Sequence, residues 1–326
     1  MSLHFQSLAV LSTGIYFTGQ ACFKIAATDM PTLAGDRPWQ LARVLLSHRT
    51  WCAGAAIIAM GACVQTISLT RLSLVEAEPM FLAGLGVLFI LAMVVMGERL
   101  TPREWSSVVL LAVAAALFTD SARFIDPARD AVGGNVDGGA VELTSATLKA
   151  PVAEVGSAAP PVLVIAVALP SLLLPVIVLL AGDLSRKGRH ARPLTGVALA
   201  INVGLLTGTA ELMLTGAADL FPDPRALLTA PYFYVFVLTT PLALGQLQIA
   251  LQRSRLVIIG LVATATAKTY LLLLATVVFR EPWPDGRDVH IAVALMASVL
   301  AIAAVPHHES PAVHHRHAFT HPHRRT

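Results

Sequence analysis

The 326-residue chain has few charged residues, since Asp, Glu, Lys and Arg together make up 13% of it while hydrophobic residues make up 56%. A soluble domain cannot bury so large an apolar share around one core. Apolar runs recur, each of about 18 to 24 residues, which is long enough to cross a hydrocarbon layer of roughly 30 Å as a helix. The composition therefore predicts an all-α, polytopic helical bundle in a membrane.

Cysteine is also scarce. The three cysteines, Cys22, Cys52 and Cys63, all lie in or beside apolar runs, which argues against a disulfide framework or a thiolate metal site. The sequence contains no His-Glu-x-x-His, no nucleotide-binding Gly-x-x-x-x-Gly-Lys-Ser/Thr loop and no serine elbow. We therefore expect neither an enzyme nor a cofactor, and any transport must be driven by gradients.

Nine spans are predicted, at residues 7–27, 51–70, 77–97, 103–119, 161–181, 196–217, 231–252, 256–279 and 288–305. The N-terminus lacks the basic region of a cleavable signal, so the first span is expected to be retained. Lys and Arg residues of the connections favour, by roughly two to one, the side that carries the C-terminal tail. The positive-inside rule thus predicts a cell-membrane protein with its N-terminus outside and its C-terminus in the cytoplasm.

The two halves of the chain share short matching segments. Residues 69–75 align with residues 251–257, Gly97-Glu98 aligns with Arg280-Glu281, and Thr18-Gly19 aligns with Thr207-Gly208. Because the offset is five spans, the second copy would be inverted, as in many secondary transporters; chance similarity between apolar helices is the alternative. The predicted units are a first half (1–119), a flexible external linker (120–160), a linker helix (161–181), a second half (182–305) and a His-rich tail (306–326).

The tail contains seven histidines between His307 and His323. Such a tract can bind a divalent metal loosely. Its prolines and irregular spacing do not provide a fixed geometry, so we favour a solvated, disordered cytoplasmic tail.

A charged corner separates the third and fourth spans. Gly97-Glu98-Arg99 is where the third helix leaves the hydrocarbon, and Thr101-Pro102-Arg103-Glu104 has the pattern of a capping box. Thr101 would be the N-cap residue and Pro102 the first helical residue. The sequence therefore predicts a new helix that begins directly after Thr101.

Charged side chains inside the predicted spans are the first candidates for function, because each costs about 2.5–3.5 kcal/mol at the centre of a bilayer on insertion scales. Lys268 lies near the middle of the eighth span and Glu211 lies in the sixth. An ion pair between them would relieve both charges. A permanent structural bridge and a gate or substrate site both remain open for this pair.

Further polar residues complete the candidate pathway: Glu76, Glu78, Gln20, Lys24, Gln65, Asn202, Gln246 and Gln248. Glu76 and Glu78 sit at the outer end of the third span, either as an exposed helix start that favours acids or as a vestibule that attracts cations. Lys24 forms a polar stripe with Gln20, and we expect its ammonium to snorkel to the inner interface. The four amides at 65, 202, 246 and 248 are expected to hydrogen-bond between helices.

The chain resembles the drug/metabolite transporter superfamily, in particular its nine-span EamA-like branch, which is related to NIPA-type magnesium transporters. The matching pieces are Gly61 to Gln65, Leu74-Val75 with Pro79, Gly97 to Thr101 with Trp105, Gly245-Gln246-x-Gln248-x-Ala250, and Glu281. The resemblance implies inverted repeats, a central cavity and alternating access. The chain departs from it at residues 263–268, where a helix-bending proline is expected, and at Lys268, whose positive charge disfavours a cation carrier.

The leading hypothesis is a gradient-driven secondary transporter of a small polar or amphiphilic metabolite. Divalent cation transport, which is based on Glu76, Glu78 and the resemblance, is one alternative. A non-transporting membrane protein with a metal-sensing His-rich tail is the other. The expected partners are the lipid bilayer and a small-molecule or ion substrate, with a homodimer left open. No nucleic-acid partner is expected, because no long basic run lies outside the tail.

Overall fold

The computed structural model describes residues 2–31, 33, 38–69, 84–123, 161–186, 196–220, 224–278 and 288–305. Every regular element in these ranges is a helix, and no strand occurs among them. The helices are α1 (Ser2–Asp29), α2 (Pro38–Ser47), α3 (Arg49–Leu69), α5 (Leu85–Ile90), the π-helix η1 (Leu91–Val95), α6 (Pro102–Arg123), α9 (Pro161–Arg186), α10 (Gly196–Leu220), α11 (Pro224–Thr229), α12 (Pro231–Arg253), α13 (Leu256–Val278) and α14 (Asp288–Ala304). The all-α prediction is therefore confirmed for the described chain.

Four of the described helices are long and apolar enough to cross a membrane, over Arg49–Ser68, Gly196–Ala217, Pro231–Arg253 and Leu256–Leu274. Shorter apolar helical stretches occur at Leu85–Val95, Val162–Leu174 and Val289–Ala304. Large apolar side chains on the outer helices are exposed, among them Val162 on α9 and Val289 on α14. Lipid is the environment in which such faces are stable, so the structure is that of a helical bundle suited to a membrane.

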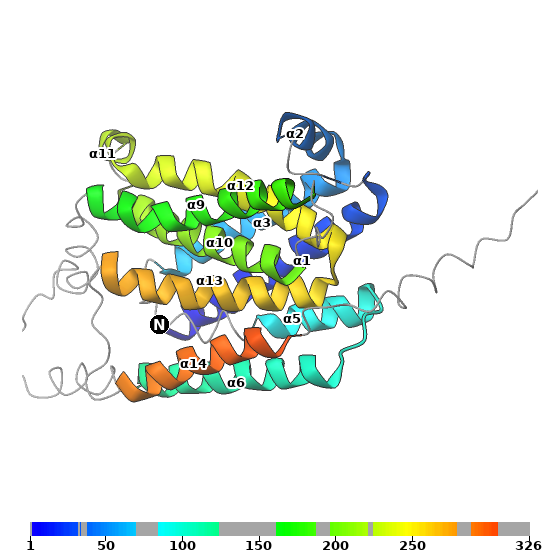
Figure 1. Cartoon of the computed structure of the whole chain (residues 1–326). Helices are drawn as coiled ribbons and strands as arrows, with labels where there is room; N and C mark the ends of the chain where they lie inside the picture. Colours follow the sequence, from blue (N-terminus) through cyan, green and yellow to red (C-terminus); the bar gives the residue numbers. More distant parts are fainter. Residues whose placement is uncertain are drawn as a thin grey trace, which may run out of the picture.

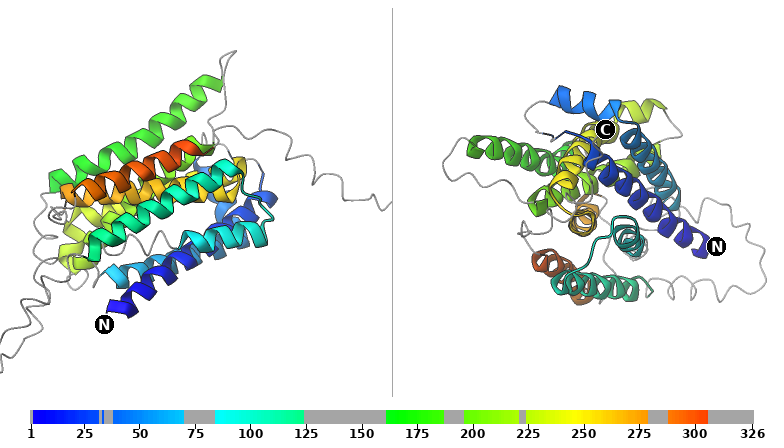
Figure 2. Two further views of the ribbon diagram at one scale, coloured as in Figure 1. Left: turned by 90° about the horizontal axis from the view of Figure 1, so that it is seen from below. Right: turned by 90° about the vertical axis from the view of Figure 1, so that its right-hand side faces the viewer.

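The long helices lie side by side with their axes roughly aligned (Figure 1). Helix α1 packs along α3, α10 packs along both α12 and α13, and α6 packs along α14. The view from the right shows the α6–α14 pair at one edge of the bundle (Figure 2). The core between these helices is apolar, with Phe17, Phe23, Leu88 and Ile259 fully buried in one cluster.

Eight of the nine predicted spans coincide with described helices, and most of their predicted boundaries agree with the helix boundaries to within a few residues. The short helices α2 and α11 were not predicted. Helix α6 continues through Arg123, past the predicted start of the linker at residue 120. The first part of the third predicted span lies outside the described residues, as do Glu76, Glu78, Glu281, the rest of the linker and the tail from residue 306.

The predicted capping box at the start of α6 is present. The Thr101 N–H donates to Glu104 Oε2 at 2.6 Å, and the Glu104 N–H donates to Thr101 Oγ1 at 3.4 Å. Pro102 is the first residue of the helix, where its missing N–H costs nothing. The sequence pattern thus fixes the exact start of this helix.

Thr101→Ala is expected to lower the free energy of unfolding by about 1 kcal/mol, because it removes the side-chain acceptor for one N–H of the first turn. The measurement is denaturant unfolding of the purified protein in detergent micelles. Thr101→Ser is the matched control, since it keeps the hydroxyl and should stay close to wild type. Equal losses in both variants would show that the methyl group of Thr101, and not the cap, stabilises the corner.

Candidate functional site

A small polar cavity lies between α1, α3, α10 and α13. Its volume is about 20 Å³, which leaves room for about one water molecule. Four of the predicted pathway residues line it: Gln20, Gln65, Glu211 and Lys268. The remaining lining residues are Thr13, Tyr16, Phe17, Thr207, Ala263, Thr264 and Ala267. Both halves of the chain therefore contribute to one site.

The expected ion pair between α10 and α13 is present in this cavity. The Lys268 ammonium donates a hydrogen bond to Glu211 Oε2. The exposed fraction of the side chain is only 7% for Lys268 and 17% for Glu211. Two opposite charges that share a buried site compensate each other's desolvation, whereas either one alone would be strongly destabilising. The cavity therefore contains one positive and one negative side chain, whose charges sum to zero.

The glutamines on the other side of the cavity have unused hydrogen-bonding capacity. Gln20 is 1% exposed, and its Oε1 has no partner among the described residues. The buried Nε2 of Gln65 is likewise without one. Two residues that line the cavity thus carry an acceptor and a donor without partners among the described residues, in addition to the two charges.

Tyr16, which was not among the predicted site residues, lies in the cavity wall beside Gln20 and Thr207. A signal for it exists. Tyr16, Gln20 and Lys24 are spaced four residues apart, so they form one stripe along α1. An aromatic residue in an apolar helix usually belongs to the core or to the membrane edge, so the sequence pattern predicts the polar stripe only from Gln20 onward.

Three other predicted pathway residues that the structure describes, Gln248, Asn202 and Gln246, do not line the cavity. Gln248 is buried and donates from Nε2 to the Phe23 carbonyl at 3.3 Å, which is the expected bond between helices. Asn202 and Gln246 are each 2% exposed, and neither is a lining residue. Asn202 Nδ2 and both amide atoms of Gln246 have no hydrogen-bond partner among the described residues, so the expected bonds between helices are not found for these atoms.

Lys24 lies at the end of the bundle that holds the turn between α12 and α13, which we name the turn end. Its ammonium donates to the carbonyl oxygens of Leu251 and Ser254, both at 2.7 Å. Snorkelling toward headgroups was expected for this lysine. The observed contact is different, because the end of α12 offers carbonyls that its own helix does not use and a dipole that attracts cations.

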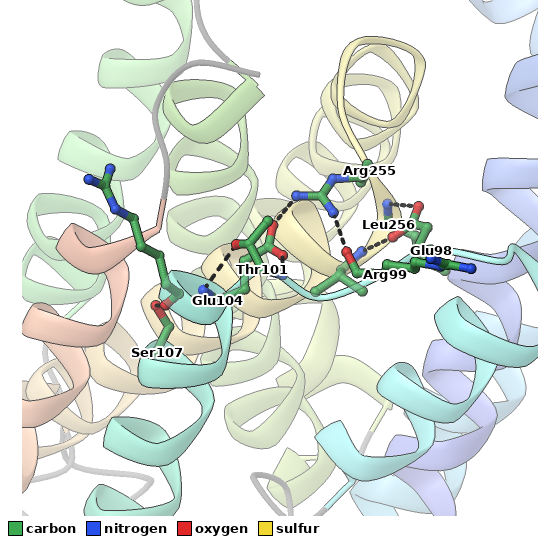
Figure 3. A network of polar contacts seen from close by, with 9 residues as sticks. Glu98, Arg99, Thr101, Glu104, Ser107, Arg255 and Leu256 are labelled. Carbon is green, nitrogen blue, oxygen red and sulfur yellow. Dashed lines mark hydrogen bonds and ion pairs between the residues drawn. The ribbon is translucent and has the colours of Figure 1, made fainter. Parts of the chain in front are cut away.

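The predicted charged corner meets the same turn (Figure 3). Glu98 accepts hydrogen bonds from the N–H groups of Leu256 at 2.7 Å and Val257 at 3.0 Å. Arg255 donates to the Arg99 carbonyl at 2.8 Å and forms an ion pair with Glu104, whose side chain is 1% exposed. The corner after η1 thus caps the first turn of α13 from outside that helix.

Comparisons of the chain with protein-family models, with curated proteins and with solved structures find no match. The fold and the site define a class, a helical membrane-type bundle with a buried, charge-compensated cavity. Within the described ranges, no group of three or more His, Cys, Asp or Glu residues is arranged to hold a metal ion.

Proposed function

We propose that the protein is a gradient-driven secondary transporter of a small polar or amphiphilic metabolite, working by alternating access. The observation that carries the proposal is the Glu211–Lys268 ion pair in a cavity built from both halves of the chain. Ionisable residues within apolar helices are costly and commonly mark a substrate or ion pathway. The resemblance to the drug/metabolite transporter superfamily supports the same function.

The proposal includes nine spans and an inverted repeat. Its support is the similar packing of α1 along α3 and of α10 along α12, which would be equivalent helices in the two copies. It also includes a cytoplasmic location for the turn end. Arg43, Arg49, Arg99, Arg103 and Arg253 all belong to helix ends or connections on that side, as the positive-inside rule requires.

In the proposed mechanism, Lys268 attracts an anionic group of the substrate or holds Glu211 until the substrate or a proton competes for it. Gln20 and Gln65 supply the neutral acceptor and donor that orient the substrate. The cavity has room for about one water molecule, so a metabolite enters only when the helices around it separate. The described conformation is therefore proposed to be an occluded one.

Divalent cation transport is the less favoured function. Glu76 and Glu78, on which it depended, lie outside the described residues. The cavity itself contains the Lys268 ammonium, which repels a divalent cation. A metal-sensing role of the His-rich tail also involves residues outside the described ranges.

Flux measurements in proteoliposomes test the proposal. Counterflow of a library of small metabolites through the wild-type protein identifies a transported compound, and Lys268→Met and Glu211→Gln should each abolish most of that flux. Met296→Ala, at an exposed position of α14, is the matched control and should keep it. Unchanged flux in both cavity variants would exclude the ion pair as the transport site.

A further inference from the structure

We propose that the contacts around the turn between α12 and α13 are a latch that closes the turn end of the cavity. The latch consists of three sets of contacts. Lys24 of α1 binds carbonyls at the end of α12, and Glu98 binds N–H groups of the first turn of α13. Arg255 binds the corner residues Arg99 and Glu104. This inference rests on the proposed function, because a latch matters only if the cavity opens.

Every latch contact joins the first half of the chain to the second. The partners are 151 to 230 residues apart in sequence, so none of these bonds stabilises a helix from within. Gln252, near the end of α12, adds two more such bonds. It accepts from the Leu33 N–H at 2.8 Å and donates to the Pro31 carbonyl at 3.0 Å. The turn is therefore held from two directions, by the end of α1 and by the corner after η1.

The latch lies directly over the cavity. Ala263, the first cavity residue of α13, is seven residues from Leu256, which is two helical turns or roughly 10 Å. On α1, Lys24 is one turn beyond the cavity residue Gln20. In sequence, Phe23 on α1 and Ile259 on α13 fall between the latch residues and the cavity residues, and both are fully buried apolar side chains of the core.

The contacts of Glu98 and Lys24 are reversible by their chemistry, whereas the Arg255–Glu104 ion pair is more deeply buried. Glu98 and Lys24 bind helix-end N–H and C=O groups, which water can satisfy equally well when the contacts break. The Glu211–Lys268 pair differs, because its groups lie deep between helices. Bonds that can be exchanged for water suit a gate, and bonds that cannot suit a fixed site.

A hinge precedes the corner. The helix changes from α to π geometry over Leu91–Val95, and the Glu98 N–H bonds back to the Ala92 carbonyl at 3.0 Å. Gly97 then has a φ of +65°, a value that glycine adopts without strain. Such π segments are frequent at functional sites, and this one lets the corner move without unwinding α5.

Thiol labelling tests the latch without a known substrate. The three native cysteines are replaced, and Thr264→Cys is introduced as the cavity reporter. A membrane-impermeant methanethiosulfonate is then applied to vesicles from one side of the membrane. That side is the one from which the reagent labels Ser106→Cys, at the exposed start of α6. Glu98→Gln and Lys24→Met should each raise the Thr264→Cys labelling rate about tenfold, the shift produced by losing about 1.4 kcal/mol of charge-assisted bonding. Arg103→Gln removes an exposed charge from the same corner and should leave the rate unchanged.

A second reporter, Ala294→Cys on α14, is buried outside the cavity and detects general loosening. An unchanged Thr264→Cys rate in the latch variants, or an equal rise at Ala294→Cys, would overturn the latch and leave the transport function intact. Faster Thr264→Cys labelling in the latch variants, together with normal flux through Lys268→Met, would instead overturn the proposed transport site and support the latch. The two proposals thus fail separately.

Discussion

Lys268→Met is expected to lower the free energy of unfolding by about 3–5 kcal/mol, because it leaves the Glu211 carboxylate without its charged partner between helices. Glu211→Gln should have an effect of similar size, since it strands the ammonium instead. Both side chains are largely buried, and both helices are apolar along their length. Denaturant unfolding in mixed micelles measures the loss.

The double variant Lys268→Met/Glu211→Gln separates lost charge pairing from lost packing. It removes both charges together, so it should recover most of the stability that either single variant loses. Val293→Met, at a partly exposed position of α14, is the matched control for introducing methionine and should unfold like wild type. Additive losses in the double variant would mean that the two residues do not act as a pair. If the double variant recovers stability but not flux, the ion pair is needed for transport and not for folding.

Gly204→Ala and Gly208→Ala should each cost about 1–3 kcal/mol of stability through overpacking. These glycines form a Gly-x-x-x-Gly pattern on α10 that lets α13 approach closely. A Cβ at residue 204 would lie 2.6 Å from the Ala263 carbonyl oxygen, and one at residue 208 would lie 2.7 Å from that of Ala267. Because the obstacle is backbone, a side-chain rotation cannot relieve it, and the losses should fall at the upper end of the range.

Gly86→Ala is the control for the glycine variants. Its Cβ would have no heavy atom within 4 Å, and alanine favours a helix over glycine by about 1 kcal/mol, so this variant should match or exceed wild-type stability. Thermal unfolding of all three variants in one detergent makes the comparison. Equal stability of Gly204→Ala and Gly86→Ala would show that α10 and α13 are not held in close contact.

Features that depend on neighbouring residues could be predicted from the sequence. The start of α6 follows from Thr101, Pro102 and Glu104, which lie within four residues of one another. The Glu211–Lys268 pair could also be predicted, although its partners are 57 residues apart, because few charges occur in the spans and each needs a counter-charge.

Contacts between a side chain and a distant backbone group could not be predicted. Glu98 binds N–H groups of Leu256 and Val257, and Lys24 binds carbonyls of Leu251 and Ser254. Every residue except proline offers such backbone groups, so the sequence does not show which helix end will receive a given charge. The placement of Asn202 and Gln246 outside the cavity had the same cause, since an amide in an apolar helix can face any neighbour.

The close contact of α10 with α13 makes these two helices one wall of the cavity. Glu211 and Lys268 both belong to this wall. Tyr16, Gln20 and Gln65 belong to α1 and α3, which form a second close pair through Gly19 and Gly54. In the proposed transport cycle, the cavity would therefore widen by the parting of two helix pairs, with the opposite charges still in contact. Volume would be gained first, and the charges would separate only in a space that water or substrate already fills.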